Sequence, residues 1–236
     1  MKSLFINNRE IKLVRSQRKT LGLQVSPQGI TARAPKRMSE RAIIDFIVSK
    51  EGWLTKILGN MPEPSQAKPI ALQHGAKITY LGEPYTLEVI EGSTKPISIQ
   101  GQTLIVPVAN THTALTQRIK TKLTKWFKQQ AQLVCTQRAK HFAPWMQVKQ
   151  RKDNQIYVRD YKRRWGSCDS KGKLSFNWRI IQAPSEVLDY VVIHELAHLQ
   201  EFNHSKKFWS IVSQQMPDYN EKEMWLKKHG PSLYGF

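Results

Sequence analysis

Cysteine, acidic residues and long apolar runs are all scarce in this chain of 236 residues. The two cysteines, Cys135 and Cys168, allow one disulfide at most, and the amino-terminal segment MKSLFINNRE lacks the apolar stretch of a secretory signal. The longest apolar runs, IIDFIV and VLDYVVI, each contain an aspartate and fall far short of the ~20 residues that span a bilayer. We therefore expect a cytoplasmic protein in a reducing compartment, with no membrane partner.

The shortage of acidic residues leaves a strong positive charge. Lysine and arginine number 37 against 18 aspartates and glutamates, which gives a formal net charge of +19. Residues 118–179 alone contain 17 basic and three acidic side chains. Such a region attracts nucleic acid or another polyanion, although the same charge also suits a solvated surface that keeps a protein soluble. Charge alone does not identify the ligand.

The organisation of the chain indicates an α+β fold. No segment repeats with a period of 20 to 50 residues, which excludes solenoids and propellers. A chain of this length can bury roughly 70% of its unfolded surface, so a core forms without metal and any bound metal is functional. We expect two parts: a β-rich part with one helix over residues 1–110, and a helix, a β-hairpin and further helices over residues 111–236.

In the first part, alternating apolar residues predict strands. LGLQVSP and GITARAP read as a hairpin, and an amphipathic helix follows with Ser39 as its N-cap. The helical pattern stops at the proline-rich MPEPSQAKP, which we expect to be a linker or a long turn. Residues 76–108 return to β-branched alternation and predict a small antiparallel sheet. This part contains no cluster of catalytic residue types.

In the second part, residues 114–142 predict a basic amphipathic helix with an apolar stripe. Two short strands joined by a turn at residues 169–172 then form a hairpin. The run SEVLDYVVIHELAHLQEF begins at Ser185 with an acid, Glu186, in its first turn. Apolar residues occupy nearly all of its faces, so we expect a buried helix. The apolar stripe of the first helix comprises Leu115, Ile119, Leu123, Trp126, Phe127, Leu133 and Val134.

That buried helix contains the pattern His194-Glu195-Leu196-Ala197-His198, which matches H-E-x-x-H. Residues four apart lie on one face of a helix, so both imidazoles can reach one metal ion while Glu195 stands beside them. Two unpaired imidazoles and a carboxylate are costly in an apolar segment unless they bind something. Imidazole ligands and tetrahedral preference make Zn²⁺ the expected ion.

The third ligand is less determined by the sequence. A catalytic zinc usually takes three protein ligands and leaves one position for water. His204 lies six residues beyond His198, and Asn203 before it tolerates the left-handed backbone that a reversal of the chain needs. Ser205 then suits the N-cap of a following helix. We favour His204, with Glu221 or Glu223 on a later helix as the competing ligands.

Residues 161–230 resemble the YgjP-like metallopeptidase domain family, which is related to the SprT-like and WLM zinc proteases. The resemblance rests on RWGSC, NWRII, AP, DYVV, HELAH, NHSKKFW and PDY in that order. It implies a minimal zincin-like core in the second part, in one domain that takes in most of the chain. It also implies zinc at His194, His198 and His204, with Glu195 as the catalytic carboxylate. The glycine that metzincins place after their second histidine is Glu201 here, so a metzincin-type turn is not implied.

These observations predict a zinc-dependent metallopeptidase in which Glu195 is the general base for an activated water molecule. A first alternative is a metal-dependent hydrolase of a phosphate-containing substrate such as a nucleoside triphosphate, because a group of cations precedes the metal helix. A second alternative is a protease tethered to nucleic acid through residues 118–179. Arg164, Tyr219 or a backbone N–H could stabilise the oxyanion, and the oligomeric state is not indicated. The cations are Arg159, Lys162, Arg163, Arg164, Lys171 and Lys173.

Overall fold

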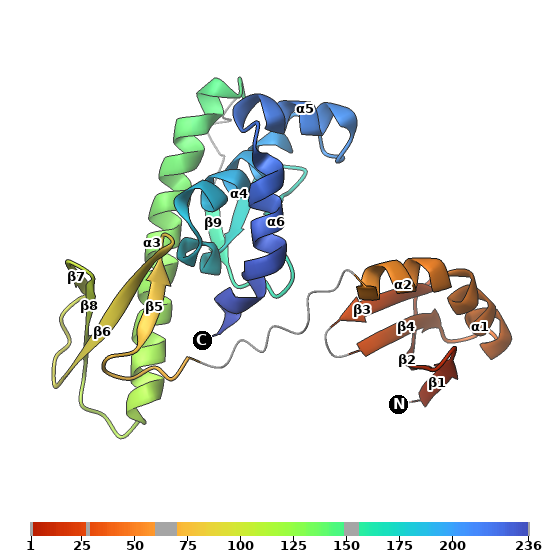
Figure 1. Cartoon of the computed structure of the whole chain (residues 1–236), viewed down its shortest axis with the longest axis horizontal. Helices are drawn as coiled ribbons and strands as arrows, with labels where there is room; N and C mark the ends of the chain where they lie inside the picture. The colour runs from red at the N-terminus through yellow and green to blue at the C-terminus, as the bar shows by residue number, and fades with distance from the viewer. Residues whose placement is uncertain (1, 27–28, 60–69, 149–155, 236) are drawn as a thin grey trace. The chain divides into compact units, whose positions relative to one another are not determined.

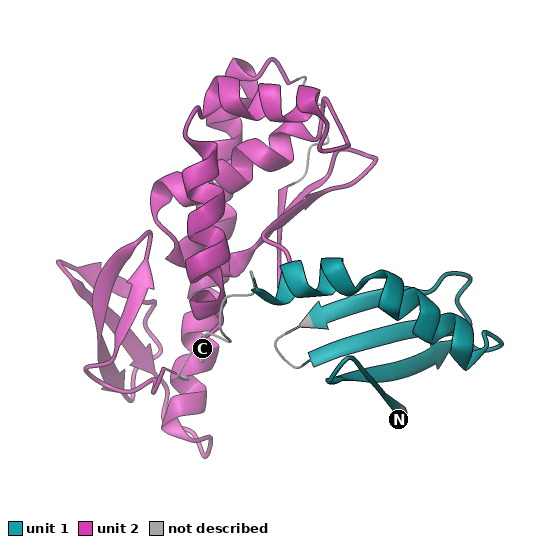
Figure 2. Cartoon of the chain, turned by 45° about the vertical axis from the view of Figure 1, so that its right-hand side comes forward, with its two compact units in different colours: residues 1–65 teal, residues 66–236 magenta. Residues whose placement is uncertain are grey.

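The computed structural model describes residues 2–26, 29–59, 70–148 and 156–235. Within these ranges the chain forms six α-helices, two short 3-10 helices and three small sheets, which confirms a mixed α+β fold (Figure 1). The chain is divided into two compact units, residues 1–65 and residues 66–236 (Figure 2). None of the helices in the described ranges combines the length and apolar character that a bilayer crossing requires.

The first unit is a four-stranded sheet with two helices. Its strand order is β1-β2-β4-β3, in which only the β2–β4 pair is parallel. The predicted hairpin is confirmed, because β3 and β4 pair antiparallel. The elements are β1 (Lys2–Ile6), β2 (Arg9–Ser16), β3 (Gly22–Ser26), β4 (Gly29–Pro35), α1 (Glu40–Ser49) and α2 (Glu51–Gly59).

The helical part of this unit begins where the sequence predicts. The Ser39 hydroxyl accepts a hydrogen bond from the Ala42 backbone N–H at 3.3 Å, so Ser39 is the N-cap of α1. The prediction of a single helix is wrong, because the chain leaves helical geometry at Lys50 and a second helix follows. Ile43, Ile47 and Leu54 are fully buried against the sheet. The linker prediction for MPEPSQAKP falls on residues 61–69, which lie outside the described ranges.

The second unit begins at residue 66, 45 residues before the start expected at residue 111. Strands β5 (Lys77–Tyr80), β6 (Glu83–Glu91), β7 (Ser98–Gln100) and β8 (Thr103–Val108) form a sheet along the amino-terminal half of α3 (Leu115–Trp145) (Figure 1). Leu104 and Val106 of this sheet share one buried core with Ile119 and Leu123 of α3. The sheet therefore belongs with the helix that follows it.

This sheet is mixed, so the prediction of a purely antiparallel sheet is wrong. Its order is β5-β6-β8-β7, and β6 pairs with β8 in parallel. The turn between β5 and β6 also packs against Pro184, in the segment before the helix that contains His194 and His198. Gly82 has φ +85°, and a Cβ atom there would lie 2.8 Å from the Pro184 Cα atom. Only glycine allows this backbone approach.

Helix α3 runs along the whole second unit and buries one face (Figure 1). The predicted positions Ile119, Leu123 and Phe127 are fully buried, whereas Leu133 is 63% exposed and does not belong to the stripe. Beyond Phe127 the buried positions are small. Small side chains let neighbouring elements pack close to the helix axis. These positions are Ala131, Cys135, Ala139 and Ala143.

The remainder of the unit holds a three-stranded sheet and the carboxy-terminal helices. The predicted hairpin is confirmed: β10 and β11 pair antiparallel across a turn in which Gly172 has φ +79°. A third strand, β9, pairs parallel with β11 and was not expected. The elements are β9 (Ile156–Arg159), β10 (Gly166–Cys168), β11 (Leu174–Asn177), η1 (Trp178–Gln182), α4 (Ser185–Ala197), α5 (Lys206–Gln215), α6 (Tyr219–His229) and η2 (Gly230–Tyr234).

Candidate metal centre

Helix α4 is buried on nearly every face, as the sequence predicts. It begins at Ser185, but without a capping hydrogen bond from a side chain, because the N-cap position is Pro184. Val187, Leu188 and Leu196 are each 1% exposed. Such close packing fixes the direction in which every polar side chain of the helix points.

A bidentate ion pair anchors α4 to α3. Arg138 of α3 donates from Nε and Nη2 to the two carboxylate oxygens of Asp189, at 2.5 Å each. This fork geometry fixes orientation as well as distance. Asp189 stands five residues before His194, so the pair also sets the rotation of α4 at the metal histidines.

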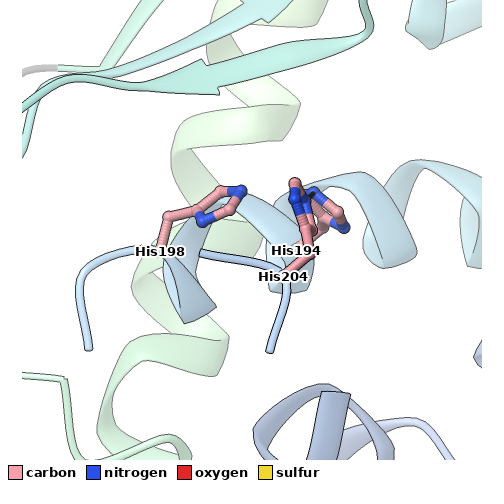
Figure 3. Close-up of side chains that lie close together, drawn as sticks. All are labelled: His194, His198 and His204. Atoms are coloured by element: carbon pink, nitrogen blue, oxygen red, sulfur yellow. Dashed lines mark hydrogen bonds between the residues drawn. The ribbon is translucent and has the colours of Figure 1, made fainter. Parts of the chain in front are cut away.

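Three imidazoles converge at the carboxyl end of α4 (Figure 3). His194 lies in the last turn, His198 is the C-cap residue, and His204 lies on the segment that returns toward α5. The Nε2 atoms of His194 and His204 are 3.0 Å apart, and one nitrogen from each of the three rings lies within 4.8 Å of the others. The structure thus brings together the three histidines that the sequence favoured.

The chain reverses after α4 without left-handed geometry. Asn203 is not among the residues with positive φ in the described ranges, so that part of the prediction is wrong. Hydrogen bonds tighten the chain beyond the helix end instead, from the backbone N–H groups of Leu199 and Gln200 to Leu196 and Ala197. The Ser205 hydroxyl then accepts from the Phe208 N–H at 3.3 Å, which confirms Ser205 as the N-cap of α5.

The Phe208 ring contacts all three imidazoles, a role that its place in the helical pattern does not indicate. Its ring is fully buried, and its centroid lies 4.9, 4.6 and 4.7 Å from those of His194, His198 and His204. Trp209 adds a second contact to His204, at 5.7 Å. An apolar wall of this kind keeps imidazoles neutral and limits their rotation.

The protonation of the histidines fits a metal ion. Burial, reinforced by the neighbouring imidazoles, lowers the pKa of His194 to about 3, so this ring is neutral. His198 donates from Nδ1 to the Glu201 carbonyl at 3.2 Å, which leaves its Nε2 free as a ligand. Burial also lowers the pKa of His198. A neutral imidazole offers an unprotonated nitrogen to a metal ion, and a set of imidazole ligands suits Zn²⁺. In the described part of the chain the second nitrogen of His194, Nδ1, has no hydrogen-bond partner.

Glu221 and Glu223, the alternatives to His204 as third metal ligand, lie next to lysine side chains instead. Glu223 forms an ion pair with Lys227 at 2.8 Å, and the exposed Glu221 lies 3.7 Å from Lys222. Neither residue joins the three histidines in a metal-ligating cluster, and among the described residues His194, His198 and His204 form the cluster with that geometry.

Glu195 is buried beside the histidines, and one of its carboxyl oxygens lacks a partner in the described part of the chain. It is 5% exposed, and its Oε2 atom has no hydrogen bond in the described part of the chain. Burial raises the pKa of Glu195 to about 8, and the nearby Arg164 guanidinium opposes this shift. An unpaired buried carboxyl is costly, so its retention indicates a ligand or a reaction that uses it.

The backbone of strand β10 packs closely against the Glu195 carboxyl group at Gly166. A Cβ atom on Gly166 would lie 2.5 Å from Glu195 Oε1 and 2.6 Å from Cγ. Real side chains never approach so closely, so only glycine leaves room for Glu195 in its present position. Gly166 belongs to the RWGSC motif, and this contact gives the motif a physical role next to the candidate base.

A pocket of about 320 Å³ lies beside Glu195 and Gly166. Its lining combines the metal helix, the segment before β10 and helix α6. The lining residues are Arg164, Trp165, Gly166, Tyr190, Val191, His194, Glu195, Glu223, Leu226 and Lys227.

The six cations that precede the metal helix do not act as one cluster. Arg164 is the one that lines the pocket. Arg159 and Lys173 lie over the Tyr157 ring, at 5.1 and 6.0 Å from its centroid, and Lys162 is exposed outside the pocket. Of the other oxyanion candidates, Tyr219 stacks on Trp209 at 5.1 Å.

The match to known proteins agrees with this geometry. The profile of the YgjP-like metallopeptidase domain matches residues 19–229, which confirms the resemblance seen in the sequence. No curated protein matches the chain significantly. The crystal structure of the metallopeptidase zymogen of Pyrococcus abyssi abylysin has 24% identity and a TM-score of 0.36, and covers 39% of this chain and 90% of that one. The corresponding zymogen of Methanocaldococcus jannaschii jannalysin has 20% identity and a TM-score of 0.35, with 39% and 92% covered. The profile spans nearly the whole sequence, so the chain belongs to the YgjP-like metallopeptidase family.

Proposed function

We propose that this protein is a zinc-dependent peptidase in which His194, His198 and His204 hold the ion and Glu195 is the general base. The observation that carries the proposal is the convergence of three imidazoles, with one nitrogen of each within 4.8 Å of the others, beside a buried carboxyl whose Oε2 atom has no partner in the described part of the chain. When bound, zinc polarises the scissile carbonyl and lowers the pKa of a water molecule to about 7.

The residues of the chain supply the proton transfers. Glu195 accepts the proton of the attacking water at a carboxylate oxygen and passes it to the leaving amine nitrogen as the peptide bond breaks. Gly166 keeps the backbone of β10 against this carboxyl group, and Phe208 keeps the imidazoles in place. Arg164 lines the same pocket and offers a positive charge to a bound substrate.

A peptide substrate fits the site better than a nucleoside triphosphate. A polyphosphate carries several negative charges and usually requires several converging cations or Mg²⁺. In this pocket Lys227 is already paired with Glu223, which leaves Arg164 as the cation without a carboxylate partner among the described residues. Binding of nucleic acid through residues 118–179 remains a separate proposal, supported by the charge of that segment.

The test is product analysis by mass spectrometry. Zinc-loaded protein is mixed with unfolded polypeptides and nucleoside triphosphates, and the Glu195→Gln protein serves as the blank. We expect peptide fragments that are absent from the blank, because removal of a general base costs about 10²- to 10⁴-fold in rate. Phosphate or pyrophosphate release without peptide fragments would contradict the proposal.

A further inference from the structure

The pocket beside Glu195 has the chemistry of a selective site for a substrate side chain. Its wall is largely apolar, with Trp165, Val191 and Leu226 as contributors. The charged residue Arg164 also lines this pocket. An occupant that suits both features has an aliphatic stem and a negatively charged end.

The ion pairs around the pocket leave one cation without a carboxylate at ion-pair distance in the described ranges, and the candidate base Glu195 is the second carboxyl group of the lining. Lys227 and Glu223 neutralise each other at 2.8 Å. Arg164 has no carboxylate within ion-pair distance in the described ranges, and its guanidinium lies over the Tyr161 ring, 5.1 Å from the centroid. An arginine held on an aromatic face keeps its donors available for a carboxylate.

The backbone that carries Arg164 is held in place by buried hydrogen bonds. Asn177 is fully buried and donates from Nδ2 to the carbonyls of Arg164 and Tyr161, at 3.2 and 2.9 Å. The Tyr234 hydroxyl donates to the same Tyr161 carbonyl at 2.9 Å. The Asn177 N–H also bonds the Trp165 carbonyl at 2.7 Å. Preorganisation of this kind reduces the entropy lost when a ligand binds.

The pocket also begins where the reaction would occur. Gly166 follows Trp165 directly, and its backbone touches the carboxyl group of Glu195. A side chain in this pocket would therefore belong to a residue next to the scissile bond. From these observations we propose that the pocket selects peptides with glutamate adjacent to the cleaved bond, bound through Arg164. This inference rests on the proposed peptidase function and names its substrate class.

The test compares three peptides that differ at one position. A peptide that the wild-type protein cleaves is made with Glu, Gln or Lys on each side of the scissile bond in turn, and kcat/KM is measured. A charge-assisted hydrogen bond predicts a preference of about 10-fold for Glu over Gln, and a larger one over Lys, on one side of the bond. Arg164→Ala should remove this preference, and Arg164→Glu should reverse it toward Lys, with zinc content unchanged.

Lys162→Ala is the matched control, because Lys162 is an exposed cation two residues away that does not line the pocket. It should keep the wild-type preference. An unchanged Glu preference in Arg164→Ala would overturn the inference while leaving the peptidase function intact.

Binding to the Glu195→Gln protein separates the two claims. The same three peptides are titrated calorimetrically into that variant and into Glu195→Gln/Arg164→Ala. If Glu195→Gln binds the Glu peptide more strongly than the other two, and the double variant does not, the selectivity of the pocket is supported. This result would stand even if the wild-type protein cleaves no peptide and the proposed function fails. Equal binding of all three peptides to both variants would overturn the inference.

Discussion

The two compact units differ in what they bury. The core of residues 1–65 is apolar throughout its described part, whereas the second unit buries four polar side chains between residues 177 and 195. Three of the four have clear structural partners: Asn177, Gln182 and Asp189 each form hydrogen bonds at or below 3.4 Å. Glu195 Oε2 has none. Among these four buried side chains, the one with an unpartnered oxygen lies at the site, and the three with partners belong to its scaffold.

The largest effect is expected for the metal ligands. His204→Ala removes one of three imidazoles and should weaken zinc binding by about 10³-fold, because two ligands hold the ion far less firmly than three. Competition with a chromophoric chelator measures the affinity. Glu223→Gln is the control and should bind zinc as the wild-type protein does. Full zinc affinity in His204→Ala, with loss in Glu223→Gln, would assign the third ligand to the carboxylate.

A smaller loss is expected from Gly166→Ala. The added Cβ would lie 2.5 Å from Glu195 Oε1, so the carboxyl group must move while the histidines stay in place. A displacement of about 1 Å costs on the order of 10²-fold in turnover. Peptide cleavage and zinc content are both measured. Gly52→Ala is a backbone control, since no atom lies within 4 Å of the position of its Cβ and its φ is not positive.

If Gly166→Ala retains wild-type turnover, the contact with Glu195 has no role in positioning the base. If it loses zinc as well as activity, the substitution has disturbed the metal centre, and the glycine acts on the fold of the site rather than on Glu195 alone.

The scaffold side of the comparison predicts a loss of stability. Asp189→Asn breaks the bidentate pair with Arg138, which joins α3 to α4. Because Arg138 is 34% exposed, we expect a loss of about 2 kcal/mol in the free energy of unfolding rather than the larger cost of a fully buried pair. Chemical denaturation of the zinc-free protein measures it. A change below about 0.5 kcal/mol would show that the pair does not support the helix.

The smallest effect on stability is expected at the site itself. Glu195→Gln replaces a buried carboxyl without a partner by a neutral amide of the same shape. The free energy of unfolding of the zinc-free protein should stay constant or rise by about 1 kcal/mol, in contrast to Asp189→Asn. The same denaturation series measures both variants. A loss comparable to that of Asp189→Asn would mean that Glu195 has a structural partner after all.

Much of this picture could be predicted from local patterns. Helical periodicity and residue types located α3, α4 and the N-caps at Ser39 and Ser205, and the spacing of His194 and His198 indicated the metal. The rest depends on contacts between residues far apart in the chain. The parallel pairing of β6 with β8 and of β9 with β11 leaves no local trace. The same holds for the packing of Leu104 and Val106 in one core with α3, which joins residues 66–110 to the second unit.

The same reasoning explains what the sequence could not show about the site. The approach of Gly166 to Glu195 spans 29 residues, and a glycine gives no sign of which side chain it accommodates. The contact of Phe208 with all three imidazoles follows from the way α5 folds back on α4. Phe208 matches an ordinary core residue in the helical pattern, and nothing in that pattern distinguishes its role.

The central claim is that three imidazoles hold a zinc ion in this protein, and X-ray absorption at the zinc edge tests it most directly. The zinc-loaded full chain should show three imidazole nitrogens at about 2.0 to 2.1 Å, completed by one oxygen ligand and without sulfur. A sulfur shell at about 2.3 Å, which would implicate Cys168, or a fit with only two imidazoles, would contradict the account.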